Sequence, residues 1–288
     1  MGTILVAVIL FVPALTGLLS CAENRRSGEV PQQRALLRGR LILGLARTFA
    51  NSAWTLWLTV LALPLGRLTG FNGSGAVDRQ RPTVILVHGL YHNPAAWFLM
   101  RRRLRQAGFA DVRCYGYASF GRDFADIADG LARLLLQTAA EGPGRRLLLL
   151  GHSLGGLVIR AACADPRLAS CGASDGCPVA GVVTLGAPHR GSTLATMLGL
   201  GRLARGLSPG GTVIQRVRAL PVCPVPGLSL YSPTDGMVLP LSGAFLDERE
   251  RATGWEERAL PPTSHVGLLY SKAAAREALA FFLARIED

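Results

Sequence analysis

Ser153 is the residue best placed to carry out chemistry, because it lies between glycines in the segment GHSLG, residues 151–155. Four leucines precede this segment, and an apolar run closed by glycines predicts a buried strand that turns sharply into a helix. Glycine is needed on both sides because a Cβ there would collide with the neighbouring strand or helix. We therefore expect Ser153 to stand exposed at the helix N-terminus as a nucleophile.

Asp235 and His265 are the candidate partners of Ser153. A serine hydroxyl is a weak nucleophile until a base takes its proton, and an imidazole base needs a carboxylate to fix its tautomer. Asp235 follows a short predicted strand over residues 226–231, and His265 lies in the loop before a terminal helix. Asp247 is the alternative acid, although the charged run around it predicts a solvated surface.

Two backbone N–H groups are expected to complete the site by binding the oxyanion of a tetrahedral intermediate. Leu154 supplies one of them, since it follows the nucleophile directly. Leu90 supplies the other, because it follows His88-Gly89 at the end of a β-branched run over residues 83–87. The alternative for His88-Gly89 is an ordinary turn at the end of a strand.

Strands and helices alternate from residue 81 onward, which predicts an α/β fold with a mostly parallel sheet and helices on both faces. Apolar or strand-like runs indicate strands at residues 83–87, 112–117, 147–150, 179–185 and 226–231, and residues 255–259 are interpreted as the last strand. Helical spacing indicates helices after Ser153 and at residues 94–107, 123–138 and 273–286.

Residues 192–221 lie between two predicted strands and are rich in glycine, leucine and arginine. An amphipathic segment at this place would form a mobile lid that binds an interface and uncovers the serine. The alternative is an ordinary surface helix. Just before this segment, His189 precedes every suitable acid in the chain, so we predict that it has a structural role.

The N-terminal region contains two uncharged hydrophobic stretches, residues 2–20 and 48–66, separated by an arginine-rich linker. Each has the length of a membrane-spanning helix, and the positive-inside rule then places the linker in the cytoplasm and the catalytic domain outside it. Cys21 resembles the lipidated cysteine of a bacterial lipoprotein, which gives the same sidedness. The alternative is a helix at residues 48–66 packed on the catalytic domain, since Asn51 and three hydroxyl residues weaken it as a span.

Two domains follow from this pattern, a membrane-anchoring region over residues 1–70 and a catalytic domain over residues 81–288. The segment FNGSG, residues 71–75, predicts a flexible linker between them. A hydrophobic content of 49% with only 17% charged residues argues against disorder. In an oxidising compartment outside the cytoplasm, Cys171 and Cys177 could form a disulfide bond, and free thiols are the alternative.

The net charge of +12 is carried almost wholly by arginine, with Lys272 as the only lysine. Such a balance is typical of proteins that meet nucleic acid or an anionic membrane surface. The arginines are mostly scattered and accompany no zinc-finger, RNA-binding or helix-turn-helix motif, so a membrane surface is favoured over nucleic acid. No CxxC pair indicates a zinc site.

Together, VHGL (87–90), GHSLGG (151–156), TLGAPHRGS (184–192), Asp235 and SHVGLL (264–269) resemble the α/β-hydrolase superfamily, and more narrowly bacterial triacylglycerol lipases and esterases. The resemblance covers about residues 81–288, and the order Ser153, Asp235, His265 is the one that an α/β-hydrolase requires. In those lipases a calcium ion braces the loop of the catalytic histidine, with an aspartate soon after that histidine among its ligands. Here VGLL follows His265, so no metal or cofactor is expected.

The sequence and the resemblance together predict a membrane-attached serine hydrolase that cleaves carboxylic esters, with acyl lipids as the expected substrates. Ser153 would be acylated, while His265 acts as base and then as acid and Asp235 orients it. The alternative among enzymes is an acyltransferase or thioesterase with the same triad, because acceptor choice depends on pocket shape. The alternative from another class is an inactive hydrolase fold that serves as a membrane-anchored scaffold.

Overall fold

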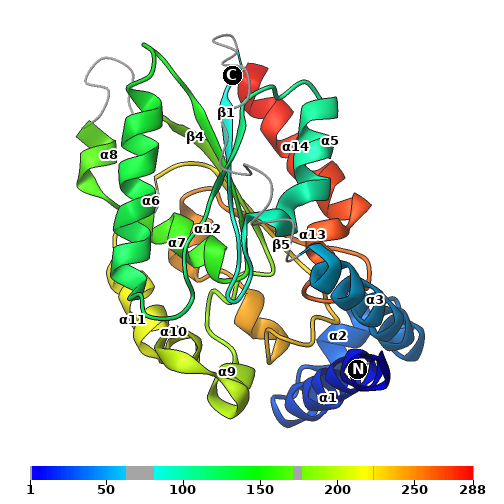
Figure 1. Cartoon of the computed structure of the whole chain (residues 1–288). Coiled ribbons are helices and arrows are strands. Elements are labelled where there is room, and N and C mark those ends of the chain that lie inside the picture. Colours follow the sequence, from blue (N-terminus) through cyan, green and yellow to red (C-terminus); the bar gives the residue numbers. More distant parts are fainter. Residues whose placement is uncertain (1, 63–80, 171–176, 223, 288) are drawn as a thin grey trace.

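The computed structural model describes residues 2–62, 81–170, 177–222 and 224–287. Within them, a six-stranded sheet has helices on both faces, and the N-terminal helices lie together at one end (Figure 1). The strands are β1 Thr83–Val87, β2 Val112–Tyr115, β3 Leu147–His152, β4 Val179–Leu185, β5 Gly227–Tyr231 and β6 Glu256–Ala259. The helices are α1 Gly2–Arg26, α2 Val30–Leu36, α3 Leu41–Ala62, α5 Phe98–Gln106, α6 Phe124–Ala139, α7 Leu154–Cys163, α8 Pro166–Ser170, α9 Thr193–Leu198, α10 Gly201–Gly206, α11 Thr212–Ala219, α12 Glu248–Ala252, α13 Gly267–Tyr270 and α14 Lys272–Glu287, with 3-10 turns η1 Pro94–Trp97 and η2 Leu241–Ala244.

Neighbouring strands of the sheet are parallel, in the order β2-β1-β3-β4-β5-β6. Both faces of β1, β3, β4 and β5 are almost wholly buried, which explains why these strands read as continuous apolar runs, whereas the edge strand β6 is mostly exposed and has the charged sequence EERA. Alternate residues of β1 join different cores, with Ile85 on one face of the sheet and Leu86 on the other. The predicted parallel sheet with helices on both faces is confirmed.

Two hydrophobic cores hold the helices against the sheet. Helices α6, α7, α10 and α11 contribute to the core on one face, and α5, α13 and α14 to the core on the other (Figure 1).

Strand β2 ends at Tyr115, two residues before the predicted end. The reason is that the backbone N–H of Tyr117 donates to His88 Nε2 at 3.2 Å and not to a neighbouring strand.

Among the described residues, no helix combines the length and the apolar composition that crossing a bilayer requires, so the structure does not support the two predicted membrane spans. Helix α3 covers most of the second stretch and turns polar side chains toward the catalytic domain. Thr48 is hydrogen-bonded to Thr234, and Thr59 to Tyr270. These contacts support the alternative, a helix packed on the catalytic domain.

Two sequence predictions concern segments outside the described residues. The linker over residues 71–75 is one of them. The other is the disulfide bond between Cys171 and Cys177, because Cys171 is not described.

Candidate active site

Ser153 forms the whole turn between β3 and α7. Its φ of 55° lies in the left-handed region, which residues with a Cβ rarely adopt. A Cβ on Gly155 would overlap the carbonyl oxygen of Val87, and one on Gly151 would lie 2.7 Å from the Gly155 backbone. Glycine is therefore required at both positions, and the predicted strand, turn and helix around Ser153 are confirmed.

Asp235 and His265 are brought together from the loops that follow β5 and β6. His265 Nδ1 lies 2.7 Å from Asp235 Oδ2, and both side chains are buried. The other carboxylate oxygen accepts hydrogen bonds from the backbone N–H groups of Met237 and Val238, at 2.7 and 3.2 Å. Because a carboxylate can only accept, His265 carries its proton on Nδ1, which leaves Nε2 free to act as a base.

Ser153, His265 and Leu90 line a single cavity of about 360 Å³. Within the described residues, the Ser153 hydroxyl makes no hydrogen bond, and none to His265 in particular. Hydrogen bonds between catalytic groups often tighten only when substrate is bound. The structure therefore places Ser153 and His265 in one cavity, with Asp235 hydrogen-bonded behind His265, and their action as a triad stays a prediction.

The two predicted oxyanion donors lie next to the nucleophile. Leu154 is the first residue of α7, so its N–H has no acceptor inside the helix. A Cβ on Gly89 would lie 2.9 Å from the Ser153 Cβ, which shows how closely the loop that carries Leu90 packs against the nucleophile. The Leu90 N–H donates to no other residue in the described ranges. Both groups are thus available to an oxyanion, and that role stays a prediction.

Three further histidines surround the site in their neutral form. Burial lowers the pKa of His88 and of His92 to about 4 and lowers the pKa of His152 well below its ordinary value. His152 Nε2 lies 2.9 Å from the His265 carbonyl oxygen, so it carries a hydrogen and donates. A neutral His152 can therefore hold the backbone of His265 without adding a positive charge beside it.

Helix α3 fixes both loops of the His265–Asp235 pair, a contribution that sequence reasoning missed. Asn51 Oδ1 accepts hydrogen bonds from the N–H and the hydroxyl of Ser264, at 3.0 and 2.8 Å. The Thr48 hydroxyl is hydrogen-bonded to the hydroxyl of Thr234, the residue before Asp235. Ser264, which binds Asn51, is likewise the residue before His265. The two α3 residues are three positions apart and therefore lie on the same face of the helix. That helical spacing of polar residues was the available signal.

Replacing Asn51 with alanine is expected to lower kcat for ester hydrolysis by about 10-fold to 10²-fold with little change in KM, because small displacements of a catalytic group are this costly. The Ser264 backbone would lose its side-chain acceptor, and His265 would be less well positioned. Steady-state kinetics with a p-nitrophenyl ester measures the effect. Trp54→Ala, on the exposed side of α3, is the matched control, and an equal loss in both variants would contradict the positioning role.

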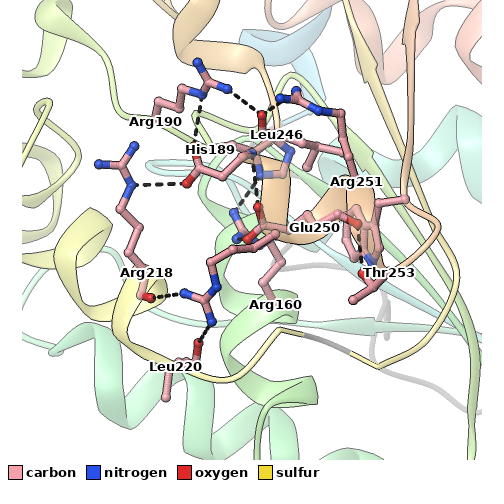
Figure 2. A network of polar contacts seen from close by, with 12 residues as sticks. Arg160, His189, Arg190, Arg218, Leu220, Leu246, Glu250, Arg251 and Thr253 are labelled. Atoms are coloured by element: carbon pink, nitrogen blue, oxygen red, sulfur yellow. Dashed lines mark hydrogen bonds and ion pairs between the residues drawn. The ribbon is translucent and has the colours of Figure 1, made fainter.

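His189 belongs to a buried polar network away from the cavity (Figure 2). Its Nδ1 lies 3.0 Å from an Arg160 nitrogen and its Nε2 lies 3.1 Å from the Ser229 hydroxyl. Burial, and then the charge of Arg160, lower the pKa of His189 well below its ordinary value, so Nδ1 can accept from the guanidinium. Arg160 also pairs with buried Glu250. These contacts agree with the structural role predicted for His189.

Asp247, the alternative acid, caps a helix and forms ion pairs. It caps α12 in a reciprocal arrangement with Glu250, and it pairs with Arg190 and Arg218. It does not line the cavity that holds Ser153. Asp235 is therefore the acid that meets His265.

Residues 192–221 form α9, α10 and α11, and residues of α9 and α10 line the cavity. Leu194, Leu198 and Leu207 line it, and the Tyr91 hydroxyl donates to the Leu200 carbonyl, which links this segment to the loop of Leu90. Residues of the predicted lid thus line the cavity, and their role as a cover stays a prediction. The movement of the lid also stays a prediction.

Residues 84–285 match the model of a family described as the alpha/beta hydrolase family. A stretch of 78 residues is 38% identical to the Probable esterase PIR7A of Oryza sativa subsp. indica, and it covers 25% of this chain and 30% of that protein. The chain therefore spans less than a third of the length of the curated relatives it matches.

Solved structures of lipases have a similar fold. The mature lipase BlEst2 of Bacillus licheniformis gives a TM-score of 0.57 at 19% identity, over 74% of this chain and 97% of that one. Aspergillus fumigatus lipase B gives the same TM-score and identity, over 73% of this chain and 53% of that one. At such identities the likeness shows the fold alone.

Proposed function

Because the chain belongs to the alpha/beta hydrolase family, we propose that it is a serine hydrolase that cleaves carboxylic esters through an acyl-enzyme on Ser153. The observation that carries the proposal is the strained turn at Ser153, which opens into the same cavity as His265, the residue that is hydrogen-bonded to Asp235. Strain of this kind persists only where the surrounding structure enforces it, and it is concentrated at functional sites.

In the proposed reaction, His265 Nε2 takes the hydroxyl proton as Ser153 Oγ bonds to the ester carbonyl carbon. The carbonyl oxygen becomes an oxyanion that accepts hydrogen bonds from the N–H groups of Leu90 and Leu154. When this intermediate collapses, the alcohol leaves with the proton from His265. A water molecule, deprotonated by His265, then releases the acid and restores Ser153.

Acyl lipids at a membrane surface are the proposed substrates. Apolar side chains of α1 and α3 are exposed, including Phe11, Ile42 and Trp54, and exposed arginines flank these helices. Apolar residues beside arginines favour binding to an anionic lipid surface. Co-sedimentation with anionic vesicles tests this attachment, and binding that survives a double Phe11→Ser and Ile42→Ser change would count against it.

A location of the catalytic domain outside the cytoplasm also stays a proposal. Alkaline phosphatase fused after the C-terminal residue tests it, since this reporter is active only after export. An inactive phosphatase, together with a bright cytoplasmic fluorescent fusion, would place the domain inside.

Covalent labelling tests the reaction type. A fluorophosphonate probe, which phosphonylates activated serines, is expected to label the folded protein on Ser153, and mass spectrometry of the digested protein would locate the adduct. The Ser153→Ala variant should remain unlabelled. An unlabelled wild-type protein would favour the inactive scaffold.

A further inference from the structure

A second cavity, of about 540 Å³, lies between α1 and α3 and adjoins the first. Six residues from four segments line both cavities: Val12, Thr16, Leu56, Met237, His265 and Val266. Ser153 and Leu90 line only the first. We call the second cavity the α1–α3 groove. It starts at the base, His265, and leads away from the nucleophile and the predicted oxyanion donors.

The groove suits a hydrocarbon chain. Among the described residues that line it, none is an aspartate, glutamate, lysine or arginine. Leu18 and Ile42, at 70% and 85% exposure, line only this groove, and their apolar side chains would otherwise face water. From Leu56 to Ile42 the helix rises about 21 Å, whereas the acyl chains of one bilayer leaflet span about 15 Å. An entire lipid chain can therefore lie along it.

The position of His265 decides which part of an ester enters the groove. In the proposed reaction the acyl carbon is bonded to Ser153 and its oxygen faces Leu90 and Leu154. The alcohol oxygen must instead lie against His265 Nε2, because that atom gives it the proton with which it leaves. The alcohol part therefore leaves on the side of His265 that faces away from Ser153 and from the N–H groups of Leu90 and Leu154. That side is the α1–α3 groove.

We propose that the α1–α3 groove binds the hydrocarbon chain of the alcohol part of the substrate. This inference rests on the proposed function and narrows its substrates to esters whose alcohol carries a long apolar chain. Two kinds of alcohol share this chemistry, a simple long-chain alcohol and a glycerol that already carries fatty acyl chains.

Alkyl acetates from ethyl to octyl acetate test the inference, since only the alcohol part lengthens along this series. Each methylene that enters the groove should raise kcat/KM by about fourfold. A parallel series of p-nitrophenyl esters lengthens only the acyl part. The two kinds of alcohol are distinguished by the rate of acetate release from two substrates. One is octyl acetate, and the other is a glycerolipid with one acetyl and two octanoyl groups.

Gly17→Phe is the variant designed to block the groove. Gly17 lines the groove, and a Cβ built on it meets nothing within 4 Å, so a larger side chain has room to enter. Phenylalanine also has a better helix propensity than glycine, so α1 should remain folded. Ala50→Phe is the matched control, because it adds the same ring at an exposed position of α3 that lines neither cavity.

In Gly17→Phe we expect kcat/KM to stop rising with the length of the alkyl chain in the acetate series. The dependence of kcat/KM on acyl length in the p-nitrophenyl series should stay as in the wild type, and Ala50→Phe should match the wild type in both series. A variant that flattens the acyl series instead would overturn the inference, because the groove would then hold the acyl chain. An alkyl series that is flat in the wild type would also overturn it. The proposed function fails differently, since a protein without a nucleophilic serine would not hydrolyse even p-nitrophenyl acetate, and both proposals would then fall.

Discussion

Ser153→Ala is expected to lower kcat for a p-nitrophenyl ester by about 10⁴- to 10⁶-fold, the range seen when a catalytic serine is removed from other hydrolases. KM should change little, because the cavity that binds the ester remains. The reason for so large an effect is that the other hydroxyls of the described residues that line the cavity are already engaged and lie outside the strained turn before α7. Those of Thr16, Thr59, Tyr91 and Ser192 each donate a hydrogen bond to a backbone carbonyl. Steady-state kinetics with active-site titration measures the effect.

The fold of this variant can be checked separately. Alanine and serine have the same Cβ, so both meet the same strain at a φ of 55°, and the thermal unfolding midpoint should stay close to that of the wild type. Turnover that persists in folded Ser153→Ala protein would show that another group is the nucleophile.

The sheet and the nucleophile turn could be predicted from the sequence because they are set by short-range patterns. Continuous apolar runs predict strands that are buried on both faces. Glycine is demanded at residue 151 by the backbone of Gly155 and at residue 155 by the carbonyl oxygen of Val87 at the end of the neighbouring strand. Asp235 and His265 could also be predicted, since each follows a strand of one parallel sheet, and the ends of such strands meet at one edge.

The N-terminal helices could not be placed in this way. An apolar stretch with a few polar residues has the same composition whether it faces lipid or packs on protein. Only the packed structure shows that Asn51 meets Ser264 and that Thr48 meets Thr234, more than 180 positions away along the chain. The α1–α3 groove could not be predicted either, because its walls come from segments that are far apart in the sequence and share no sequence pattern.

Asp235→Asn is expected to lower kcat by about 10³- to 10⁴-fold, close to the effect of the same change in a well-studied serine protease. Asp235 Oδ1 accepts from the backbone N–H groups of Met237 and Val238. In the variant the amide oxygen would keep that position, which turns the amide NH₂ group toward His265 Nδ1. His265 would then have to accept at Nδ1 and carry its hydrogen on Nε2, where it could no longer take the proton of Ser153.

The control for this substitution is Asp247→Asn, which makes the same chemical change at the alternative acid. Asparagine caps helices about as well as aspartate, so α12 should remain folded, and kcat should stay near the wild-type value. Parallel kinetics on the two variants decides between the acids. If Asp247→Asn lost activity while Asp235→Asn kept it, the assignment of Asp235 would be wrong. If neither lost activity, His265 would not depend on a carboxylate partner, and the proposed triad would have to be abandoned.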